Sequence, residues 1–318
     1  MYAFVVSSLS SRAIQGCYSL QMIIQQCLLP SPEGEIIFGD CIEFMQSMPN
    51  QSVDAIITDP PYLYLSHKLD RPFDERAFFA HCFRVLKKDS MLAFFGRGAS
   101  FYKWNVICKE LGFDFIEEVV WDKSRSSSPM LALQRCHELI AVWRKGKKSV
   151  NRVHIDKIEY DRLAGRSDRL ESDVRQLAEL LSKYSKIRTQ SELDALQAEQ
   201  EFTQPSKMKH GLCVHAGTMK SRDRRFGVLQ AHTRGKLLSS IIRVDKEHYQ
   251  FEHPTQKPLR LMRLLVKLLT NEDELVLDPF CGSGSTCLAA KTEGRRWLGI
   301  EIDTEYYKVA MDRLGIVI

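Results

Sequence analysis

Residues 275–286 have the sequence LVLDPFCGSGST, and this stretch decides the fold. An apolar run of strand type, 275–277, ends at the acid Asp278 and passes through a turn of small residues to a helix start near Thr286. Glycines in the turn let the backbone approach a ligand closely, and the first helical turn offers unpaired N–H groups. The sequence therefore predicts a strand–turn–helix unit with a ligand at the carboxyl end of its strand.

A second acid follows the next strand-like run. Residues 297–300 are apolar and end at Glu301, seventeen residues after Gly284. A carboxylate there can accept both hydroxyls of a ribose, as in the dinucleotide-binding folds. The turn lacks the Lys-Ser/Thr pair of a phosphate-binding loop, and Asp278 would repel phosphate. The alternative is a tight turn beside a solvated Glu301, but the order of these features favours a nucleoside that carries positive charge, such as S-adenosylmethionine.

Strands and helices alternate on both sides of a long central segment. The expected strands are 35–38, 55–58, 91–95, 115–121, 139–143, 274–277 and 297–300. The expected helices are 40–48, 74–86, 100–111, 258–269, 286–293 and 304–314. This alternation predicts an α/β fold with a doubly wound, parallel sheet, formed by the two ends of the chain.

The central segment, 145–250, has a different pattern. Apolar positions from Leu163 to Tyr184 are spaced by three, four or seven residues on a charged background, which predicts a helix of about 20–25 residues with a coiled-coil-like seam. Ser191 is placed to cap a second helix. Such a helical hairpin either packs within its own domain or forms a homodimer contact, and the pattern favours neither.

Charge is concentrated in the same segment. The chain has a net charge of +5, but between Thr203 and Lys246 ten Lys and Arg residues face two acids, so this stretch carries +8 and the remainder −3. A polyanion contact is the expected consequence, and a merely solvated basic loop is the alternative. The candidate residues for this polyanion, which is DNA by the family resemblance given below, are Arg222, Arg224, Arg225, Arg234 and Lys236.

Composition excludes several classes of protein. Hydrophobic residues make up 44% and charged residues 27%, and no run approaches the roughly 18 apolar residues of a membrane helix. The first twelve residues lack the pattern of a secretory signal. The nine cysteines include no CxxC pair, so we expect neither a disulfide framework nor a metal site, and the pattern suits a reducing cytoplasm.

A second motif, Asp59-Pro60-Pro61-Tyr62, directly follows the strand-like run 55–58. Two prolines fix the backbone and remove two N–H donors, which leaves rigid, outward-facing carbonyls. The Asp59 carboxylate and the Pro60 carbonyl could hold both hydrogens of an exocyclic amino group, while Tyr62 stacks on the flat base. An ordinary proline-rich turn with a half-buried tyrosine is the alternative.

Together these motifs resemble the S-adenosylmethionine-dependent DNA amino-methyltransferases, which make N6-methyladenine or N4-methylcytosine. The family's catalytic motif matches 59–62, its cofactor motif matches 278–284 and its ribose-binding acid matches Glu301. Segments 253–258 (HPTQKP), 39–41 (GDC) and 135–138 (RCHE) are also similar to family patterns. The resemblance covers about 35–143 and 253–314, and it leaves the insert and the first 34 residues aside.

The order of the motifs is that of the family's β-type permutation, in which the catalytic motif comes first and an insert recognises the target. The resemblance thus implies a circularly permuted Rossmann-like methyltransferase domain. Its expected parts are an N-terminal extension of unknown role (1–34), a catalytic half (35–144), a target-recognition insert (145–250) and a cofactor-binding half (251–318). Because Met22 is an alternative start, we expect residues 1–21 to be dispensable.

The resemblance also implies roles for individual residues. The catalytic residues are Asp59, Pro60, Pro61 and Tyr62. The residues that bind S-adenosylmethionine are Asp40, Cys41, Lys257, Asp278, Phe280, Gly282, Ser283, Gly284 and Glu301. Among them Asp40 takes the adenine amino group, Phe280 shapes the pocket wall and Lys257 approaches the cofactor's carboxylate.

Asp rather than Ser before Pro-Pro-Tyr favours adenine in double-stranded DNA as the target, in a bacterial or phage restriction–modification setting and without a metal. Three alternatives stay open at this point: N4-cytosine methylation by the same site, a DNA-binding relative without turnover, and an RNA-modifying enzyme.

Overall fold

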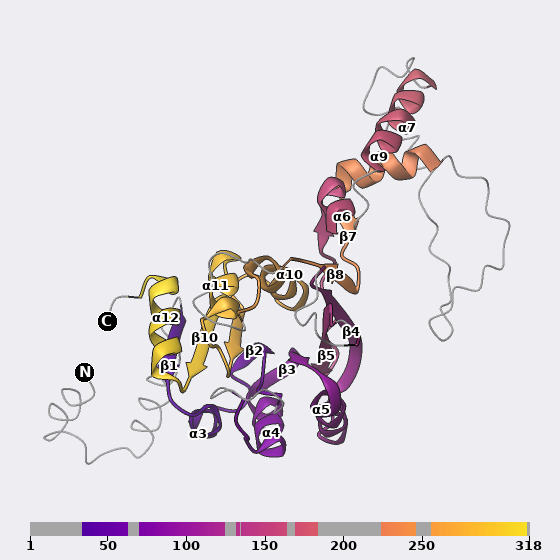
Figure 1. Cartoon of the computed structure of the whole chain (residues 1–318). Helices are drawn as coiled ribbons and strands as arrows, with labels where there is room; N and C mark the ends of the chain where they lie inside the picture. The colour runs from indigo at the N-terminus through magenta and orange to yellow at the C-terminus, as the bar shows by residue number, and fades with distance from the viewer. Residues whose placement is uncertain are drawn as a thin grey trace, which may run out of the picture. The chain divides into compact units, whose positions relative to one another are not determined.

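The computed structural model describes residues 34–62, 70–124, 132–133, 135–163, 169–183, 224–245 and 256–316 (Figure 1). The chain folds as two units. The described residues up to Asn151 and those from Ser240 onward form the first unit, and the described residues within Arg152–Ser239 form the second. Residues 1–33, most of the predicted N-terminal extension, lie outside the described residues.

A mixed sheet forms the centre of the first unit. In the described part of the chain it has eight strands in the order β1-β10-β9-β2-β3-β5-β4-β8. Their bounds, in that order, are Gly34–Phe38, Arg296–Glu301, Leu275–Asp278, Val53–Thr58, Leu86–Gly96, His137–Lys145, Asp114–Asp122 and Ile241–Arg243. Strands β9 and β2 and residues 90–96 of β3 are almost entirely buried and mostly apolar, as expected for strands that helices cover on both faces.

The expectation of a parallel sheet is right for one part and wrong for another. Strands β1, β10, β9, β2 and β3 pair in parallel, whereas β5 pairs antiparallel with both β3 and β4. The reason is the connection: the sequence predicts no helix between the strands 115–121 and 139–143, and a parallel pair needs a crossover connection. Strand β8 lies within the range expected for the insert, but it belongs to this sheet and pairs in parallel with β4.

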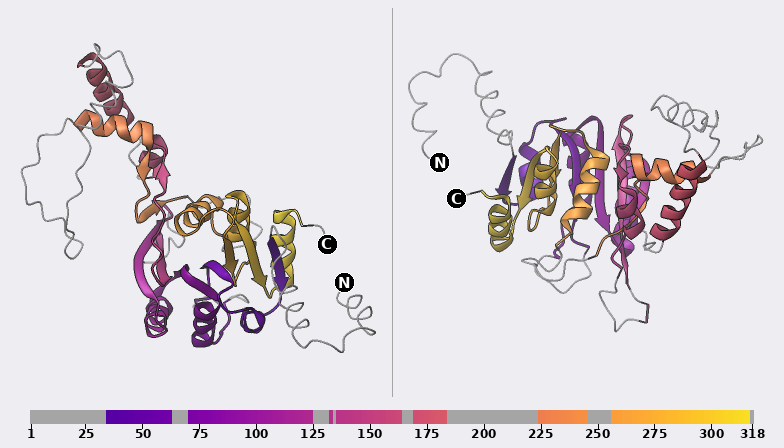
Figure 2. Two further views of the ribbon diagram at one scale, coloured as in Figure 1. Left: turned by 180° about the vertical axis from the view of Figure 1, so that it is seen from behind. Right: turned by 90° about the horizontal axis from the view of Figure 1, so that it is seen from above.

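Helices cover both faces of this sheet (Figures 1 and 2). One face carries α3 (Cys41–Ser47), α4 (Glu75–Val85) and α5 (Gly98–Glu110), and the other carries α10 (Leu259–Leu269), α11 (Ser285–Thr292) and α12 (Thr304–Leu314). Aspartates begin three of them: Asp40, Asp74 and Asp303 accept backbone N–H groups of the first turn. The doubly wound α/β fold is therefore confirmed.

The sheet has a switch point between β9 and β2. These strands are parallel neighbours, with Ala55 opposite Val276 and Ile56 opposite Leu277. The helix that follows β9 is α11 and the helix that follows β2 is α4, and they lie on opposite faces. Because the two chain segments leave the sheet in opposite directions, a crevice opens at the carboxyl ends of these strands, where open α/β sheets bind ligands.

The second unit contains three helices and a two-stranded ribbon in its described part. The helices are α6 (Lys157–Leu163), α7 (Arg169–Lys183) and α9 (Arg224–Arg234), and β6 (His154–Ile155) pairs antiparallel with β7 (Lys236–Leu237). Three buried charged side chains join α6 to α7, since the Lys157 ammonium contacts Asp161 and lies 2.6 Å from the carboxylate of Asp173. Asp173 also lies 3.1 Å from His232 of α9.

The predicted helix of this unit differs from the structure in its length, and several of its predicted seam positions are exposed. Helix α6 ends at Leu163, and α7 has 15 residues. The predicted seam positions Leu170, Val174 and Leu181 are exposed, whereas Leu180 is buried. Among the described residues, the packed face of α7 thus includes Leu180 and Asp173, and a homodimer contact through the exposed apolar positions stays a prediction. Tyr184 and the helix expected after Ser191 lie outside the described residues. Among described helices, none is both long and apolar enough to cross a membrane.

Candidate active site

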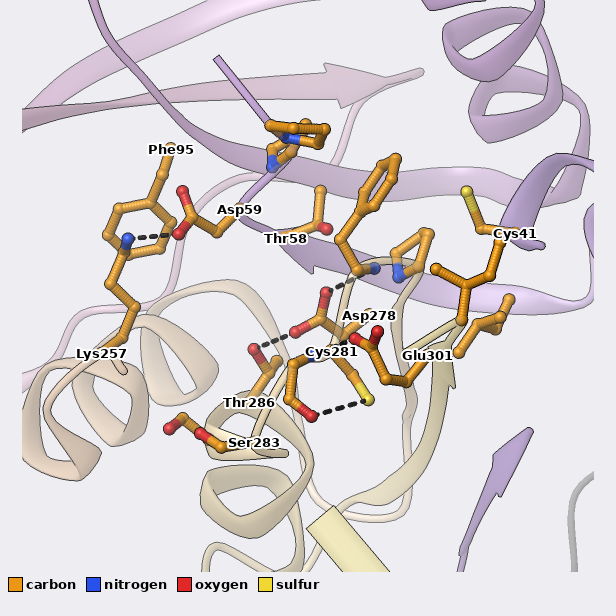
Figure 3. Close-up of a pocket in the computed structure, with 18 of the residues that line it drawn as sticks. Cys41, Thr58, Asp59, Phe95, Lys257, Asp278, Cys281, Ser283, Thr286 and Glu301 are labelled. Atoms are coloured by element: carbon orange, nitrogen blue, oxygen red, sulfur yellow. Dashed lines mark hydrogen bonds and ion pairs between the residues drawn. The ribbon is translucent and has the colours of Figure 1, made fainter. Parts of the chain in front are cut away.

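A cavity of about 450 Å³ opens at the switch point of the first unit. This volume is in the range of pockets that hold small ligands and cofactors. Figure 3 shows Asp59 and Lys257 at one end, Cys41 and Glu301 at the other, and Asp278 between them. The cavity wall therefore joins the two motifs that are more than 200 residues apart in the sequence.

Glu301 ends β10 with a carboxylate whose two oxygens are both fixed by backbone groups. The N–H of Gly282 donates to Oε2 at 2.8 Å, and the N–H of Asp303 donates to Oε1 at 2.7 Å. Burial raises the pKa of Glu301, and these two N–H groups oppose the rise. Since each carboxylate oxygen can accept a second hydrogen bond, Glu301 is oriented to receive two hydroxyls.

Asp278 lies at the end of β9 and is almost fully buried. The Thr286 hydroxyl donates to one of its oxygens at 2.5 Å, and the Phe280 N–H donates to the other at 3.2 Å. Burial raises the pKa of Asp278 to about 7 despite these hydrogen bonds. Among the described residues no Lys or Arg forms an ion pair with it, so a cationic ligand group would find an uncompensated carboxyl here.

The small-residue turn needs its glycines for different reasons. Both Gly282 (φ 52°) and Gly284 (φ 76°) have left-handed backbone conformations, which favour glycine. Gly282 lines the cavity, but Gly284 begins α11, where a Cβ would lie 3.2 Å from the Cβ of Ala310. Arg313 of α12 donates to the carbonyl and hydroxyl oxygens of Ser283 and holds the turn from behind.

Asp40 and Cys41 form the far end of the cavity. One oxygen of Asp40 accepts the N–H groups of Ile42 and Glu43 and so caps α3. Cys41 is buried against the hydrophobic core, and burial raises the pKa of its thiol to about 12. This end is thus a neutral thiol beside a carboxylate that is fixed by one of its oxygens.

The Asp59–Tyr62 turn forms the opposite end. The Tyr62 hydroxyl donates to Oδ1 of Asp59, and the Ser100 hydroxyl donates to the Tyr62 carbonyl at 2.9 Å. The Tyr62 ring packs 6.1 Å from the ring of Trp104, measured between centroids. Pro60 and Pro61 complete the wall between them. The turn is therefore attached to α5 through both its backbone and its aromatic ring.

Lys257 lines the cavity together with the cofactor-binding turn, and its side chain contacts Asp59. Its ammonium donates to Oδ2 of Asp59, lies 3.3 Å from Oε2 of Glu138, and covers the ring of Phe95 at 4.8 Å from its centroid. Burial lowers the pKa of Lys257, but the two carboxylates outweigh it and hold the pKa above its ordinary value. Lys257 therefore contacts the catalytic motif, and its contact with a cofactor carboxylate stays a prediction.

Glu138 is the site residue whose role the motifs did not reveal. It lies near the start of β5, lines the cavity, and pairs with Lys123 as well as Lys257. Burial would raise the pKa of Glu138, but the two ammonium groups outweigh it and lower the pKa to about 2. The sequence signal for it was its place in the segment 135–138, which resembles a family pattern.

Every predicted catalytic residue and eight of the nine predicted cofactor residues line this one cavity, and Gly284 is the exception. The predicted DNA-contacting residues belong to the second unit. Arg234 and Lys236 are exposed there, Arg224 and Arg225 lie in the first turn of α9, and Arg222 lies outside the described residues. In the described part of the chain, no cluster of His, Cys, Asp and Glu has the arrangement of a metal site.

The first unit has a Rossmann-like sheet with a nucleoside-sized cavity at its switch point. An acid ends a neighbouring strand, and a rigid Asp-Pro-Pro-Tyr turn forms part of the cavity wall. Together these features define a nucleotide-modifying α/β enzyme. A family model described as DNA methylase, for N6 and N4 methyltransferases, matches residues 53–312. The chain belongs to this DNA methylase family.

Individual proteins agree with this assignment. The protein YubD of Escherichia coli (strain K12), which is named as a methylase, is 25% identical over 297 residues, which are 88% of this chain and 90% of YubD. The crystal structure of an M1.HpyAVI–SAM complex has a TM-score of 0.52 at 21% identity and covers 88% of this chain and 98% of its own. The PvuII DNA methyltransferase, specific for cytosine N4, has a TM-score of 0.55 at 15% identity, with 90% of this chain and 88% of its own covered. At these identities the two solved structures demonstrate the fold.

Proposed function

We propose that this protein transfers a methyl group from S-adenosylmethionine to the N6 amino group of adenine in duplex DNA, with the target base flipped out of the helix. The observation that carries the proposal is that one cavity joins the Asp59–Tyr62 turn to the 278–284 turn and Glu301. A methyl donor and an acceptor base need such a shared cavity, because the two reacting atoms must come into contact.

The chemistry of the cavity residues fits S-adenosylmethionine. Glu301 has two fixed oxygens for the ribose hydroxyls, Asp278 has a buried carboxyl for a positive charge, and Asp40 has an acceptor for the adenine amino group. When bound, S-adenosylmethionine supplies an electrophilic methyl group on a positively charged sulfur. Gly282 and Ser283 leave room for the ligand along the turn, and Phe280 forms part of the cavity wall.

Asp59 and Tyr62 prepare the acceptor nitrogen. The lone pair of an aromatic amino group is delocalised into the ring, so the nitrogen is a weak nucleophile. Hydrogen bonds from both amino hydrogens to the Asp59 carboxylate and the Pro60 carbonyl favour tetrahedral geometry and return the lone pair to the nitrogen. The Tyr62 ring offers a flat apolar surface for the extruded base, which lowers the cost of unstacking it.

Adenine is the proposed target because an aspartate precedes Pro-Pro-Tyr, as in the resemblance described above. N4-cytosine methylation needs the same geometry around an amino group and is the competing possibility, and the fold likeness to the PvuII enzyme fits it equally well. The basic residues of the second unit, including Arg234 and Lys236, are proposed to bind the duplex, through phosphates or through base edges. The motif order supports a β-type permuted domain with this unit as the target-recognition insert.

The test is incubation of purified protein with tritiated S-adenosylmethionine and duplex DNA, followed by nucleoside digestion and chromatography. We expect the label in N6-methyladenine. Label in N4-methylcytosine would keep the mechanism but overturn the choice of base. Cofactor binding without labelled DNA, at salt concentrations where the protein binds duplex, would overturn the proposed reaction and favour an RNA substrate or a binding protein without turnover.

A further inference from the structure

Four side chains of alternating charge form a row of ion pairs that ends at Asp59. The order is Lys123, Glu138, Lys257 and Asp59, and each contacts the next. Three of the four side chains are nearly enclosed, with 4% of Lys123, 12% of Glu138 and 10% of Lys257 exposed. Two positive and two negative charges cancel within the group, which makes burial of the three enclosed side chains tolerable.

Aromatic rings and the backbone fix the two ammonium groups of this row of ion pairs. Lys257 lies over Phe95, and the ammonium of Lys123 lies 5.2 Å from the ring centroid of Trp121. Lys257 directly precedes Pro258, which begins α10, so its backbone is fixed by a helix start. Lys257 is therefore held from three sides: by its backbone, by Phe95 and by Glu138.

The contacts of Asp59 use one partner for each oxygen. Lys257 takes Oδ2 and the Tyr62 hydroxyl takes Oδ1. A carboxylate held at both oxygens cannot rotate about its Cβ–Cγ bond, so its remaining lone pairs keep fixed directions. Glu138 forms no hydrogen bond with Asp59, so any effect of Glu138 on the orientation of Asp59 passes through the ammonium of Lys257, apart from the direct repulsion between the two carboxylates.

We propose that Lys257 is the positioning residue for the Asp59 carboxylate and that Glu138 holds Lys257 in place for this task. This inference deepens the proposed function and rests on it. It changes the role expected for Lys257 from cofactor binding to orientation of the group that receives the target amino hydrogen. Glu138, to which the motifs assigned no role, thereby becomes a second positioning residue, which acts on Lys257.

The charged and titratable groups that face Asp59 come from several elements: Lys257 before α10, Glu138 of β5, Tyr62 of its own turn and Asp278 of β9. Burial raises the pKa of Asp59, Lys257 and Tyr62 lower it, and Glu138 raises it. Loss of Lys257 should therefore raise the pKa of Asp59 further, whereas loss of the Glu138 charge should not. This opposite sign separates the two residues in a pH profile.

The experiment compares Lys257→Met, Lys257→Arg, Glu138→Gln and the double variant Lys257→Met/Glu138→Gln with the wild-type protein. Lys148→Met is the matched control, because Lys148 also forms an enclosed ion pair, at 2.6 Å with Glu274, but does not line the cavity. The measurements are kcat and KM for DNA methylation from pH 5 to 9, the Kd for S-adenosylmethionine without DNA, and the thermal unfolding midpoint.

For Lys257→Met we expect kcat to fall about 100-fold, because misplacement of a reacting partner by about 1 Å has an effect of this size. The Kd for S-adenosylmethionine should stay unchanged, and the acidic limb of kcat/KM should move to higher pH. Lys257→Arg should recover part of kcat and keep the limb in place. Glu138→Gln should lower kcat without moving the limb upward, and the double variant should be no slower than Lys257→Met, since both changes act through one contact. Lys148→Met should keep the wild-type kcat.

A wild-type kcat in Lys257→Met would overturn the proposal. A second result would also overturn it: weaker S-adenosylmethionine binding by Lys257→Met that fully explains the lower kcat/KM, with the acidic limb of the pH profile unmoved. Lys257 would then bind the cofactor and not position Asp59. If Lys257→Met fails to fold, Glu138→Gln and Lys257→Arg test the proposal. Wild-type kinetics in Glu138→Gln would refute the proposed role of Glu138 in holding Lys257. A wild-type protein that binds cofactor but methylates no DNA would overturn the proposed function, and this inference with it.

Discussion

Glu138 and Asp278 are two buried carboxyl groups of the same cavity, and their pKa values are shifted in opposite directions. Burial acts to raise the pKa of both groups, yet the pKa of Glu138 is lowered to about 2 and that of Asp278 is raised to about 7. The difference lies in the neighbours: Lys123 and Lys257 face Glu138, whereas hydroxyl and N–H donors are the described partners of Asp278. One end of the cavity is therefore neutralised within the protein, and the other is prepared for a cation from outside.

This comparison assigns different chemistry to the two ends. At the catalytic end, fixed counter-charges keep Glu138 ionised and Lys257 holds Asp59 in place, so the protein orients a group before substrate arrives. At the cofactor end, the missing counter-charge is proposed to come with the ligand. The two ends should consequently respond differently to mutation: one in turnover, the other in cofactor affinity.

The largest expected effect is at the catalytic end. Asp59→Ala removes the oxygens proposed to accept the amino hydrogen, and we expect kcat to fall on the order of 1000-fold, as when an active site loses a key hydrogen-bonding group. The Kd for S-adenosylmethionine should change little, because Glu301 and Asp278 remain. Radiolabel incorporation and calorimetry measure the two quantities. Full activity in Asp59→Ala would remove the catalytic end from the comparison.

The next largest effect is at the cofactor end. Glu301→Ala removes two oxygens held by the N–H groups of Gly282 and Asp303. Loss of two hydrogen bonds to a charged group costs about 3 kcal/mol, which corresponds to a Kd for S-adenosylmethionine weaker by about 100-fold. At saturating cofactor, kcat should recover most of its wild-type value. Glu272→Gln, at an exposed position before β9, is the control and should bind normally. A Glu301→Ala protein with wild-type affinity would show that the ribose is bound elsewhere.

A smaller effect is expected from pH. A cation binds the ionised form of Asp278, whose pKa is about 7, so affinity for S-adenosylmethionine should rise with pH up to about 7 and level off above it. Below pH 7 the loss approaches about tenfold per pH unit. Calorimetry between pH 5.5 and 8.5 measures this, and Asp278→Asn should bind more weakly but with a flat profile.

The same group has the opposite effect on stability without ligand. Asp278 has a pKa in the folded state above its ordinary value, so the folded protein binds more protons than the unfolded chain between about pH 4 and 7. Its contribution to the free energy of unfolding is therefore lost as pH rises through this window. Thermal unfolding of wild-type protein against Asp278→Asn tests the sign. A pH dependence that persists unchanged in the variant would assign it to another group.

The sequence predicted the strand, turn and helix start at the cofactor end of the cavity because this part is local. Strand, turn and helix start are contiguous in residues 275–286, and Glu301 ends the following strand. The periodicity of each piece is visible in a short window, and parallel strands place their carboxyl ends at one edge of the sheet. No long-range contact had to be known.

The catalytic end was predicted in part, because part of it depends on strand direction. In an all-parallel sheet the start of β5 would lie at the edge opposite to Asp59. The antiparallel pairing of β5 with β3, with Leu139 opposite Gly96, brings Glu138 to the cavity instead. Apolar spacing predicts that a strand exists, but the direction depends on the neighbours that it pairs with. The role of Glu138, and with it that of Lys257, could not be found from spacing.

The smallest expected effect sharpens the comparison within the catalytic end. Tyr62→Phe keeps the aromatic ring but removes the hydroxyl that donates to Oδ1 of Asp59. Since Lys257 still holds Oδ2, the carboxylate keeps one of its two fixed contacts. One hydrogen bond of about 1 kcal/mol corresponds to a kcat lower by about fivefold. The acidic limb of kcat/KM should move slightly to higher pH, because the hydroxyl lowers the pKa of Asp59.

Tyr62→Ala should be slower than Tyr62→Phe, since it also removes the ring proposed to stack on the extruded base. Tyr102→Phe, at an exposed position on α5, is the control for loss of a tyrosine hydroxyl and should keep wild-type kinetics. If Tyr62→Phe were as slow as Tyr62→Ala, the hydroxyl and not the ring would carry the effect, and Asp59 would depend on Tyr62 as much as on Lys257. Equal effects of Tyr62→Phe and Lys257→Met would likewise mean that a hydrogen bond orients the carboxylate as firmly as an ion pair does.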